Sequence, residues 1–161
     1  MKLLWITNNI FPEATRLLTG EGESRETGGW VLGAADSLLN SNCGIELHVA
    51  SVSRLVKNLT VLTGERITHH IIPYGKGNIR YNPSYEEYWR QIEKLVRPNL
   101  VHIHGTEASH GLAYLNACGS DKVVVSLQGI KSGIAPFYCA GITKSQVYLN
   151  TTFRDIIRGN I

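Results

Sequence analysis

The chain has 161 residues, a length that suits one domain with its own hydrophobic core and leaves little room for two ordinary domains. Hydrophobic residues make up 43% and charged residues 18%, and the net charge is only +3 from scattered basic residues, so intrinsic disorder and nucleic-acid binding are disfavoured. The amino terminus lacks the apolar core of a signal peptide, and the three cysteines lack zinc-site spacing, so we expect a cytoplasmic protein with reduced thiols.

The first two predicted elements are joined by a long connection. Residues 2–7 contain an unbroken apolar run, Leu3 to Ile6, and predict a strand at a central position of a sheet. Residues 8–27 are polar and have no sustained period, so a long loop is expected there. A helix is predicted over residues 30–39, directly after Gly28 and Gly29. The backbone N–H groups of these two glycines could approach a phosphate. A tight turn without a ligand is the alternative for this glycine pair.

Two further strands follow this helix. Apolar residues predict a strand over residues 45–52, which completes a strand–helix–strand unit. Residues 53–64 fit a short helix or a strand and stay unassigned, whereas residues 66–73 are predicted to be a strand that ends at a proline. His69 and His70 fall on opposite faces of that strand, so they cannot bind one metal ion together and are interpreted as structural or exposed.

The clearest predicted helix covers residues 83–97. Ser84 is its expected cap, glutamates favour its first turn, and its apolar residues form one stripe that is interpreted as core. Further along, residues 122–127 predict another buried strand and residues 151–158 predict a helix. The segment 130–150 stays largely unassigned, with a loop and a short helix expected in it.

Polar residues gather where a predicted buried strand, residues 100–103, ends near Gly105. Side chains alternate along a strand, so His102 and His104 point to the same face. His104 lies nearer the carboxyl end, where open α/β sheets bind ligands. We therefore interpret His102 as core packing and His104 as a candidate site residue.

The residues after this strand supply further candidates. Thr106 is expected to cap a helix that carries Glu107 in its first turn and His110 one turn later. A carboxylate beside an imidazole suits general acid–base chemistry, although both side chains could simply decorate a helix start. Gln128 follows the next buried strand, and it would share the rim of the sheet with His104 if the two strands are neighbours.

The alternation of strands and helices predicts an α/β fold, namely a Rossmann-like, doubly wound, mostly parallel sheet flanked by helices, as a single domain over residues 1–161. The strand order is left open. The His-x-His pattern could supply two ligands of a metal-dependent hydrolase, but no later strand adds a matching ligand. A dinucleotide oxidoreductase would need a glycine-rich turn directly after the first strand, where Asn8 and Asn9 stand instead. No metal and no nicotinamide cofactor are therefore expected.

Three motifs together carry a resemblance to a known family. The stretch NLVHIHGTEASHG, the glycine pair before the first long helix and VVVSLQG at a later strand resemble, in order and spacing, the amino-terminal domain of family-4 retaining glycosyltransferases with the GT-B fold. The resemblance covers nearly the whole chain. It implies the acceptor-side half of such an enzyme, with the carboxyl-terminal nucleotide-sugar domain missing from these residues and no activity of this part alone.

The resemblance also implies roles for individual residues. Gly28 and Gly29 match the glycine pair whose backbone approaches the donor phosphates and the transferred sugar, and His104 matches the histidine region that lines the cleft. Gln128 stands where many members have a histidine that contacts the sugar, and a glutamine can hydrogen-bond a hydroxyl but cannot carry a proton. The candidate substrate-binding residues are therefore Gly28, Gly29, His104, Glu107, His110 and Gln128.

The implied reaction is transfer of a hexosyl group from a nucleotide-sugar to a saccharide or lipid-linked acceptor, with retention of configuration, in the synthesis of cell-surface polysaccharide or glycoconjugates. The nucleotide-sugar is a co-substrate, and no cofactor is implied. A basic face of such a protein would contact a membrane, although the chain gives little direct sign of one, and an apolar face left by the missing domain predicts weak homodimerisation. The alternative is a non-catalytic carbohydrate- or partner-binding module.

Overall fold

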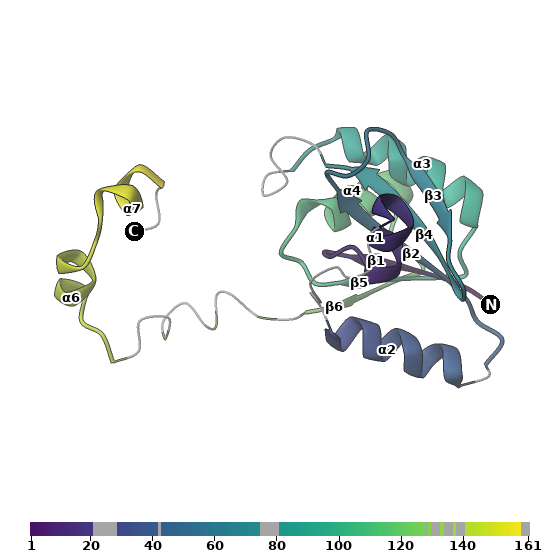
Figure 1. Ribbon diagram of the computed structural model, residues 1–161, viewed down its shortest axis with the longest axis horizontal. Coiled ribbons are helices and arrows are strands. Elements are labelled where there is room, and N and C mark those ends of the chain that lie inside the picture. Colours follow the sequence, from purple (N-terminus) through teal and green to yellow (C-terminus); the bar gives the residue numbers. More distant parts are fainter. Residues whose placement is uncertain are drawn as a thin grey trace. The chain divides into compact units, whose positions relative to one another are not determined.

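The chain divides into two compact units, Met1–Gln128 and Gly129–Ile161. The computed structural model describes residues 1–20, 29–41, 43–74, 81–127, 129, 133, 137 and 141–158. The first unit is an α/β domain with a six-stranded, mostly parallel sheet flanked by helices, so the predicted fold class is confirmed (Figure 1). Among the described residues, no helix is both long enough and apolar enough to cross a membrane.

The sheet has the strand order β3-β4-β2-β1-β5-β6. Its strands are β1 (Lys2–Thr7), β2 (Glu46–Ser53), β3 (Thr60–Thr63), β4 (Ile67–Pro73), β5 (Leu100–His104) and β6 (Val123–Ser126). Neighbouring strands are parallel except that β3 runs antiparallel to β4. The central position predicted for β1 is confirmed, because β2 and β5 pair with its two edges. The unassigned segment 53–64 contains the short strand β3 at the edge of the sheet.

Helices cover both faces of the sheet (Figure 1). Those of the first unit are α1 (Pro12–Thr19), α2 (Gly29–Asn40), α3 (Ser84–Val96) and α4 (Ser109–Cys118). Alternation along β1 sends Leu4 and Ile6 into a core with Trp89 of α3, whereas Trp5 packs on the other face with Val31 of α2. The sheet is therefore buried between α2 on one face and α3 with α4 on the other.

The prediction of a loop throughout residues 8–27 is wrong, because α1 lies within that segment. Phe11 is buried at its amino-terminal cap, a proline occupies its first turn, and Gly20 ends it with a φ of 72° that favours glycine. Glu13 fixes the helix to the sheet, because its Oε2 lies 2.8 Å from His69 Nε2 and its Oε1 accepts the Glu65 N–H at 2.8 Å. The helix is only 8 residues long and Ala14 is its only buried residue, so it offers no long apolar stripe.

Three local predictions about element ends need correction. Ser84 is the first residue of α3 and not its cap: Pro83 occupies the N-cap position, and Asn82 Oδ1 accepts the Ser84 N–H at 3.0 Å. The helix expected to start at Thr106 starts at Ser109, because Gly105 turns with a φ of 89° and the chain then crosses from the sheet to the helix layer. The predicted buried strand 122–127 is the shorter β6, and Val124 and Val125 are exposed because this strand lies at the edge of the sheet.

The described residues of the second unit include the short helices α6 (Lys144–Leu149) and α7 (Phe153–Arg158). The helix predicted over residues 151–158 is therefore confirmed. The side chain of Thr143 caps α6 by accepting the Gln146 N–H, and the Gln146 side chain accepts the Thr143 N–H at 2.9 Å. Local capping of this kind stabilises the start of a helix without help from distant residues.

Candidate functional site

The strand order places a candidate site at the carboxyl ends of β1 and β5. From β1 the chain continues outward through β2 and β4 on one side and through β5 and β6 on the other, which makes the β1–β5 boundary the topological switch point. Ligands of open α/β sheets bind in the crevice at such a boundary. Thr7 at the end of β1 is in register with His104 at the end of β5. The side-chain amide of Asn8 donates a hydrogen bond of 2.9 Å to Glu107 Oε2, which joins the loops that follow the two strands.

His104 is the central side chain of this site. It lies on the α2 face of the sheet, where its ring centroid is 3.8 Å from that of His102 and 4.4 Å from that of Trp5. The ring of Trp30, in the first turn of α2, lies 5.5 Å away. His104 is only 3% exposed, whereas Trp30 is half exposed. An exposed aromatic ring therefore lies beside a buried imidazole at the strand end.

Neither ring nitrogen of His104 has a hydrogen-bond partner among the described residues. Burial, assisted by the neighbouring His102, lowers the pKa of His104 to about 4, so the imidazole is neutral at pH 7. A neutral imidazole offers one N–H donor and one acceptor. Buried polar atoms without partners are rare in folded proteins, and they concentrate at binding and catalytic sites. Because both nitrogens are shielded from water, contact with a ligand requires neighbouring side chains to move.

The start of α2 adds a positive electrostatic field to the same region. Gly29 is the first residue of this helix, Trp30 follows it, and the first turn contains no acidic residue. The unpaired N–H groups at a helix start carry partial positive charge and bind anions. Of the predicted glycine pair, Gly29 thus occupies the expected place, whereas Gly28 lies outside the described residues, as does Gln128. Their predicted roles stay predictions.

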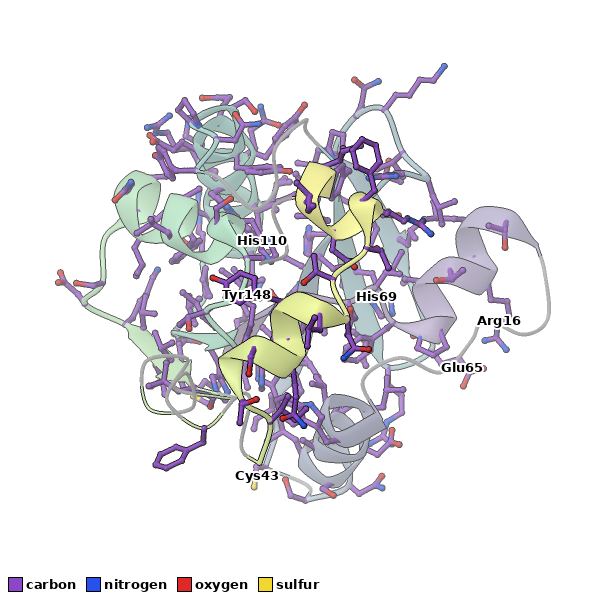
Figure 2. All side chains as sticks on the ribbon, turned by 90° about the vertical axis from the view of Figure 1, so that its left-hand side faces the viewer. Arg16, Cys43, Glu65, His69, His110 and Tyr148 are labelled. Carbon is purple, nitrogen blue, oxygen red and sulfur yellow. The ribbon has the colours of Figure 1, made fainter. Side chains whose placement is uncertain are left out.

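The predicted cluster of His104, Glu107 and His110 is spread over different parts of this edge. Glu107 lies in the exposed loop before α4 and bonds to Asn8. His110 belongs to α4 (Figure 2). This helix covers the opposite face of the sheet from His104, and His110 hydrogen-bonds to the backbone of Thr7. Burial lowers the pKa of His110 to about 4. No contact joins Glu107 to His110 among the described residues, so the suggested acid–base pair is not formed.

Two features were missed from the sequence. Ser126 Oγ lies 2.6 Å from His102 Nε2, so the histidine assigned to core packing has a polar partner on β6 and is only partly buried. The side chains of His102 and Ser126 lie on the same face of the sheet as that of His104. The alternation of side chains along β5 and β6 was the sequence signal that could have placed them there. Among the described residues no carboxylate bonds to His102, so this pair lacks the third member of a hydrolytic triad.

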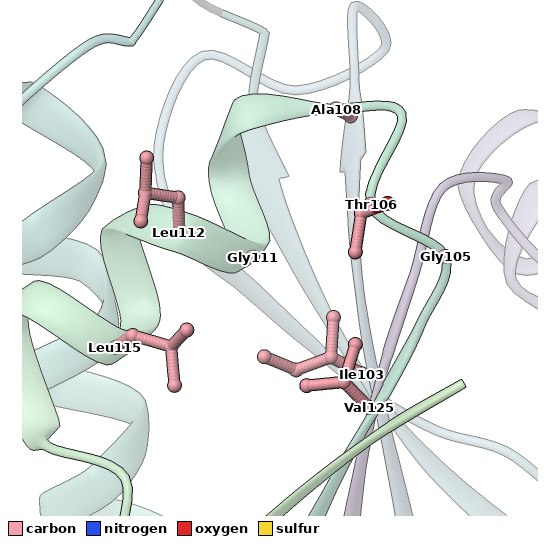
Figure 3. Close-up of a pocket in the computed structure, with 8 residues that line it drawn as sticks. All are labelled: Ile103, Gly105, Thr106, Ala108, Gly111, Leu112, Leu115 and Val125. Atoms are coloured by element: carbon pink, nitrogen blue, oxygen red, sulfur yellow. The ribbon is translucent and has the colours of Figure 1, made fainter. Parts of the chain in front are cut away.

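An apolar pocket opens on the other face of β5 and β6 and was also not predicted (Figure 3). Its volume is about 270 Å³. It is lined by Ile103, Gly105, Thr106, Ala108, Gly111, Leu112, Leu115 and Val125. The lining offers almost no hydrogen-bonding side chain apart from that of Thr106, so the pocket suits an apolar group and not the polar edge of a sugar.

In the part of the chain that the structure describes, no group of three or more His, Cys, Asp or Glu side chains is arranged to hold a metal ion. No protein-family model matches the sequence, and neither curated proteins nor solved structures give a significant match.

Proposed function

We propose that this chain is the acceptor-side half of a retaining glycosyltransferase, which contributes one wall of a cleft for a nucleotide-sugar and a hydroxyl acceptor. The observation that carries the proposal is the combination of His104, whose two buried ring nitrogens have no partner among the described residues, and the start of α2 beside it. The motifs NLVHIHGTEASHG and VVVSLQG, which resemble those of family-4 retaining enzymes, contain the strands β5 and β6, which are parallel neighbours in the sheet.

The chemistry of these groups suits a nucleotide-sugar. The helix start stabilises negative charge on a diphosphate, and that charge increases as the bond to the sugar breaks. A neutral His104 can donate to one oxygen of the ligand and accept from a hydroxyl. Trp30 offers an exposed aromatic surface for the apolar face of a sugar ring. None of these groups is an acid–base pair, so transfer needs further residues, and we expect this chain to bind a donor without turning it over.

A non-catalytic carbohydrate-binding module is the second candidate. The observation that favours it is the absence, among the described residues, of a contact between Glu107 and His110 that could shuttle a proton. Such a module would bind free saccharides through Trp30 and would gain little from a diphosphate. The two candidates therefore differ in the ligand that the site prefers.

Tryptophan fluorescence tests the proposal directly, because Trp5 and Trp30 flank His104. We expect a saturable change in emission when the full chain is titrated with UDP- and GDP-sugars, and a weaker change with the matching free sugars. Replacement of Trp30 by Phe identifies which ring reports the binding. A saturable response to free sugars alone would favour the module, and no saturation with any nucleotide-sugar would overturn the proposal.

Substitution of His104 separates a binding role from a packing role. His104→Phe keeps an aromatic ring but removes both unpartnered nitrogens, so we expect an unchanged or higher melting temperature. Donor affinity should fall about tenfold, the loss expected for one or two hydrogen bonds to a ligand. His104→Leu serves as a second variant in case the larger ring strains its neighbours. Unchanged affinity in a folded variant would remove His104 from the site, and sugar transfer by the chain alone would contradict its role as a half-site.

A further inference from the structure

The net charge of this protein is confined to its second unit. Residues 1–128 contain twelve basic and twelve acidic side chains, whereas residues 129–161 contain four basic side chains and one acidic side chain. The overall net charge of +3 therefore comes entirely from Gly129–Ile161. The net charge of the whole chain alone does not show this uneven distribution between the two units.

The same unit exposes large apolar side chains. On α7, Phe153 is 77% exposed and Ile157 is 69% exposed, and Ile156 is also exposed. These three positions have the spacing i, i+3 and i+4, which places them on one side of a helix, while the exposed Arg154 lies outside that stripe. On α6, Leu149 is 84% exposed and Tyr148 beside it is also exposed. Both helices thus present apolar residues that the unit itself does not bury.

The only acidic residue of the unit is already engaged. Asp155 Oδ2 accepts the backbone N–H of Thr152 at 3.0 Å and the hydroxyl of the same residue at 2.5 Å. In return, the backbone N–H of Asp155 donates to Thr152 Oγ1 at 3.3 Å. Its carboxylate therefore caps the amino terminus of α7, where its negative charge stabilises the helix, and the neighbouring Arg154 side chain is exposed.

We propose that the second unit docks on an anionic lipid bilayer, with Phe153, Ile156 and Ile157 inserted at the interface and Arg154 at the headgroups. Amphipathic helices with basic polar faces and aromatic or aliphatic opposite faces bind membranes in this way. The excess of positive charge favours a negatively charged surface over a neutral protein surface, and the exposed apolar stripe favours lipid over nucleic acid. This inference does not depend on the proposed glycosyltransferase function.

Vesicle sedimentation of the full chain tests the proposal. We expect the protein to pellet with vesicles that mix phosphatidylglycerol and phosphatidylcholine, to remain largely in solution with phosphatidylcholine alone, and to be released as salt is added. Equal binding to both vesicle types, or no binding to the anionic vesicles, would overturn the proposal. Nucleotide-sugar binding, which is read at Trp5 and Trp30 in the first unit, is a separate measurement that can succeed or fail independently.

Substitutions on α7 distinguish the apolar from the electrostatic contribution. The double variant Ile156→Gln/Ile157→Gln should lower the vesicle partition coefficient more than tenfold, because it removes two buried aliphatic groups from the bound state. Arg154→Gln should lower it about fivefold. Lys94→Gln removes the same charge from an exposed position of α3 and should change it little.

Two results with these variants would count against the membrane. Unchanged binding in Ile156→Gln/Ile157→Gln would show that α7 does not insert. A concentration-dependent dimer in light scattering that this variant abolishes, without vesicle binding by the parent chain, would assign the apolar face to a second copy instead. Circular dichroism of each variant verifies that the fold is retained.

Discussion

Gly111 shows how a single residue sets the distance between a helix and the sheet. A Cβ atom at this position of α4 would lie 2.9 Å from Ile103 Cγ2, and Ile103 is buried in β5. Real Cβ atoms avoid contacts this short, so the helix or the strand would have to move. The absence of a side chain at residue 111 therefore allows α4 to pack directly on the strand that carries His104.

Replacing Gly111 by alanine should destabilise the protein. Overpacking costs about 1–3 kcal/mol, and the better helix propensity of alanine offsets up to about 1 kcal/mol of that. Gly33→Ala is the matched control, because Gly33 also lies within a helix but a Cβ there meets nothing within 4 Å. The control should raise the free energy of unfolding by about 0.5–1 kcal/mol. Urea denaturation of both variants measures the difference, and shifts in the same direction would refute the argument.

At the scale of elements, α1 illustrates a helix that tertiary contacts define more than its own sequence does. Its only buried residue is Ala14, and its polar attachment runs through Glu13 to His69 and to the backbone of Glu65. Burial alone would raise the pKa of Glu13, but the hydrogen bonds from His69 and from the Glu65 amide lower it below its usual value. The carboxylate is therefore ionised at neutral pH and holds α1 on the sheet.

Replacing Glu13 by glutamine should loosen α1. The amide cannot accept both hydrogen bonds with the strength of a carboxylate, so we expect the free energy of unfolding to fall by about 1–2 kcal/mol. Backbone hydrogen exchange should also become faster in α1 than in α3. Glu65→Gln is the control, because it removes the same charge while Glu65 contacts Glu13 through its backbone N–H. Equal exchange rates in the two variants would show that the Glu13 carboxylate does not fix the helix.

For the other elements, the accuracy of the prediction depends on how strongly the local sequence pattern specifies each one. The strands β1, β2, β4 and β5 and the helices α2 and α3 have long apolar runs or stripes, and their predicted positions were confirmed. The start of α4 was placed wrongly because a glycine turn, and not a side-chain cap, separates it from β5. The exposure of β6 was missed because an unbroken apolar run reads the same at the centre and at the edge of a sheet.

At the scale of the whole molecule, three buried histidines make stability sensitive to acid. Burial lowers the pKa of His70, His104 and His110 to about 4, with neighbouring histidines adding to the effect at His70 and His104. In the unfolded chain their pKa returns to about 6.5. Because the unfolded state binds protons more readily, stability is complete above the unfolded pKa and decreases as the pH falls from 6.5 towards 4.

Urea denaturation at several pH values measures this effect. Each of these imidazoles should lower the free energy of unfolding by about 2 kcal/mol at about pH 5 relative to about pH 7.5. The midpoint of urea unfolding should therefore move to clearly lower urea concentrations. His104→Phe should reduce the loss, because one of the three groups no longer takes up a proton. A midpoint that stays constant over this range would mean that these side chains are accessible to protons in the folded state.

The sequence by itself determined the α/β class, the central position of β1 and the strand end at His104, because apolar runs, glycines and alternation are local properties. Only the tertiary structure decided that neither nitrogen of His104 has a partner within the described part of the chain and that His104 lies beside Trp30. It also placed His110 on the opposite face and bonded Glu107 to Asn8. Residues far apart in the chain meet through the order of strands and the packing of helices, and neither is encoded in the spacing of residues along one segment.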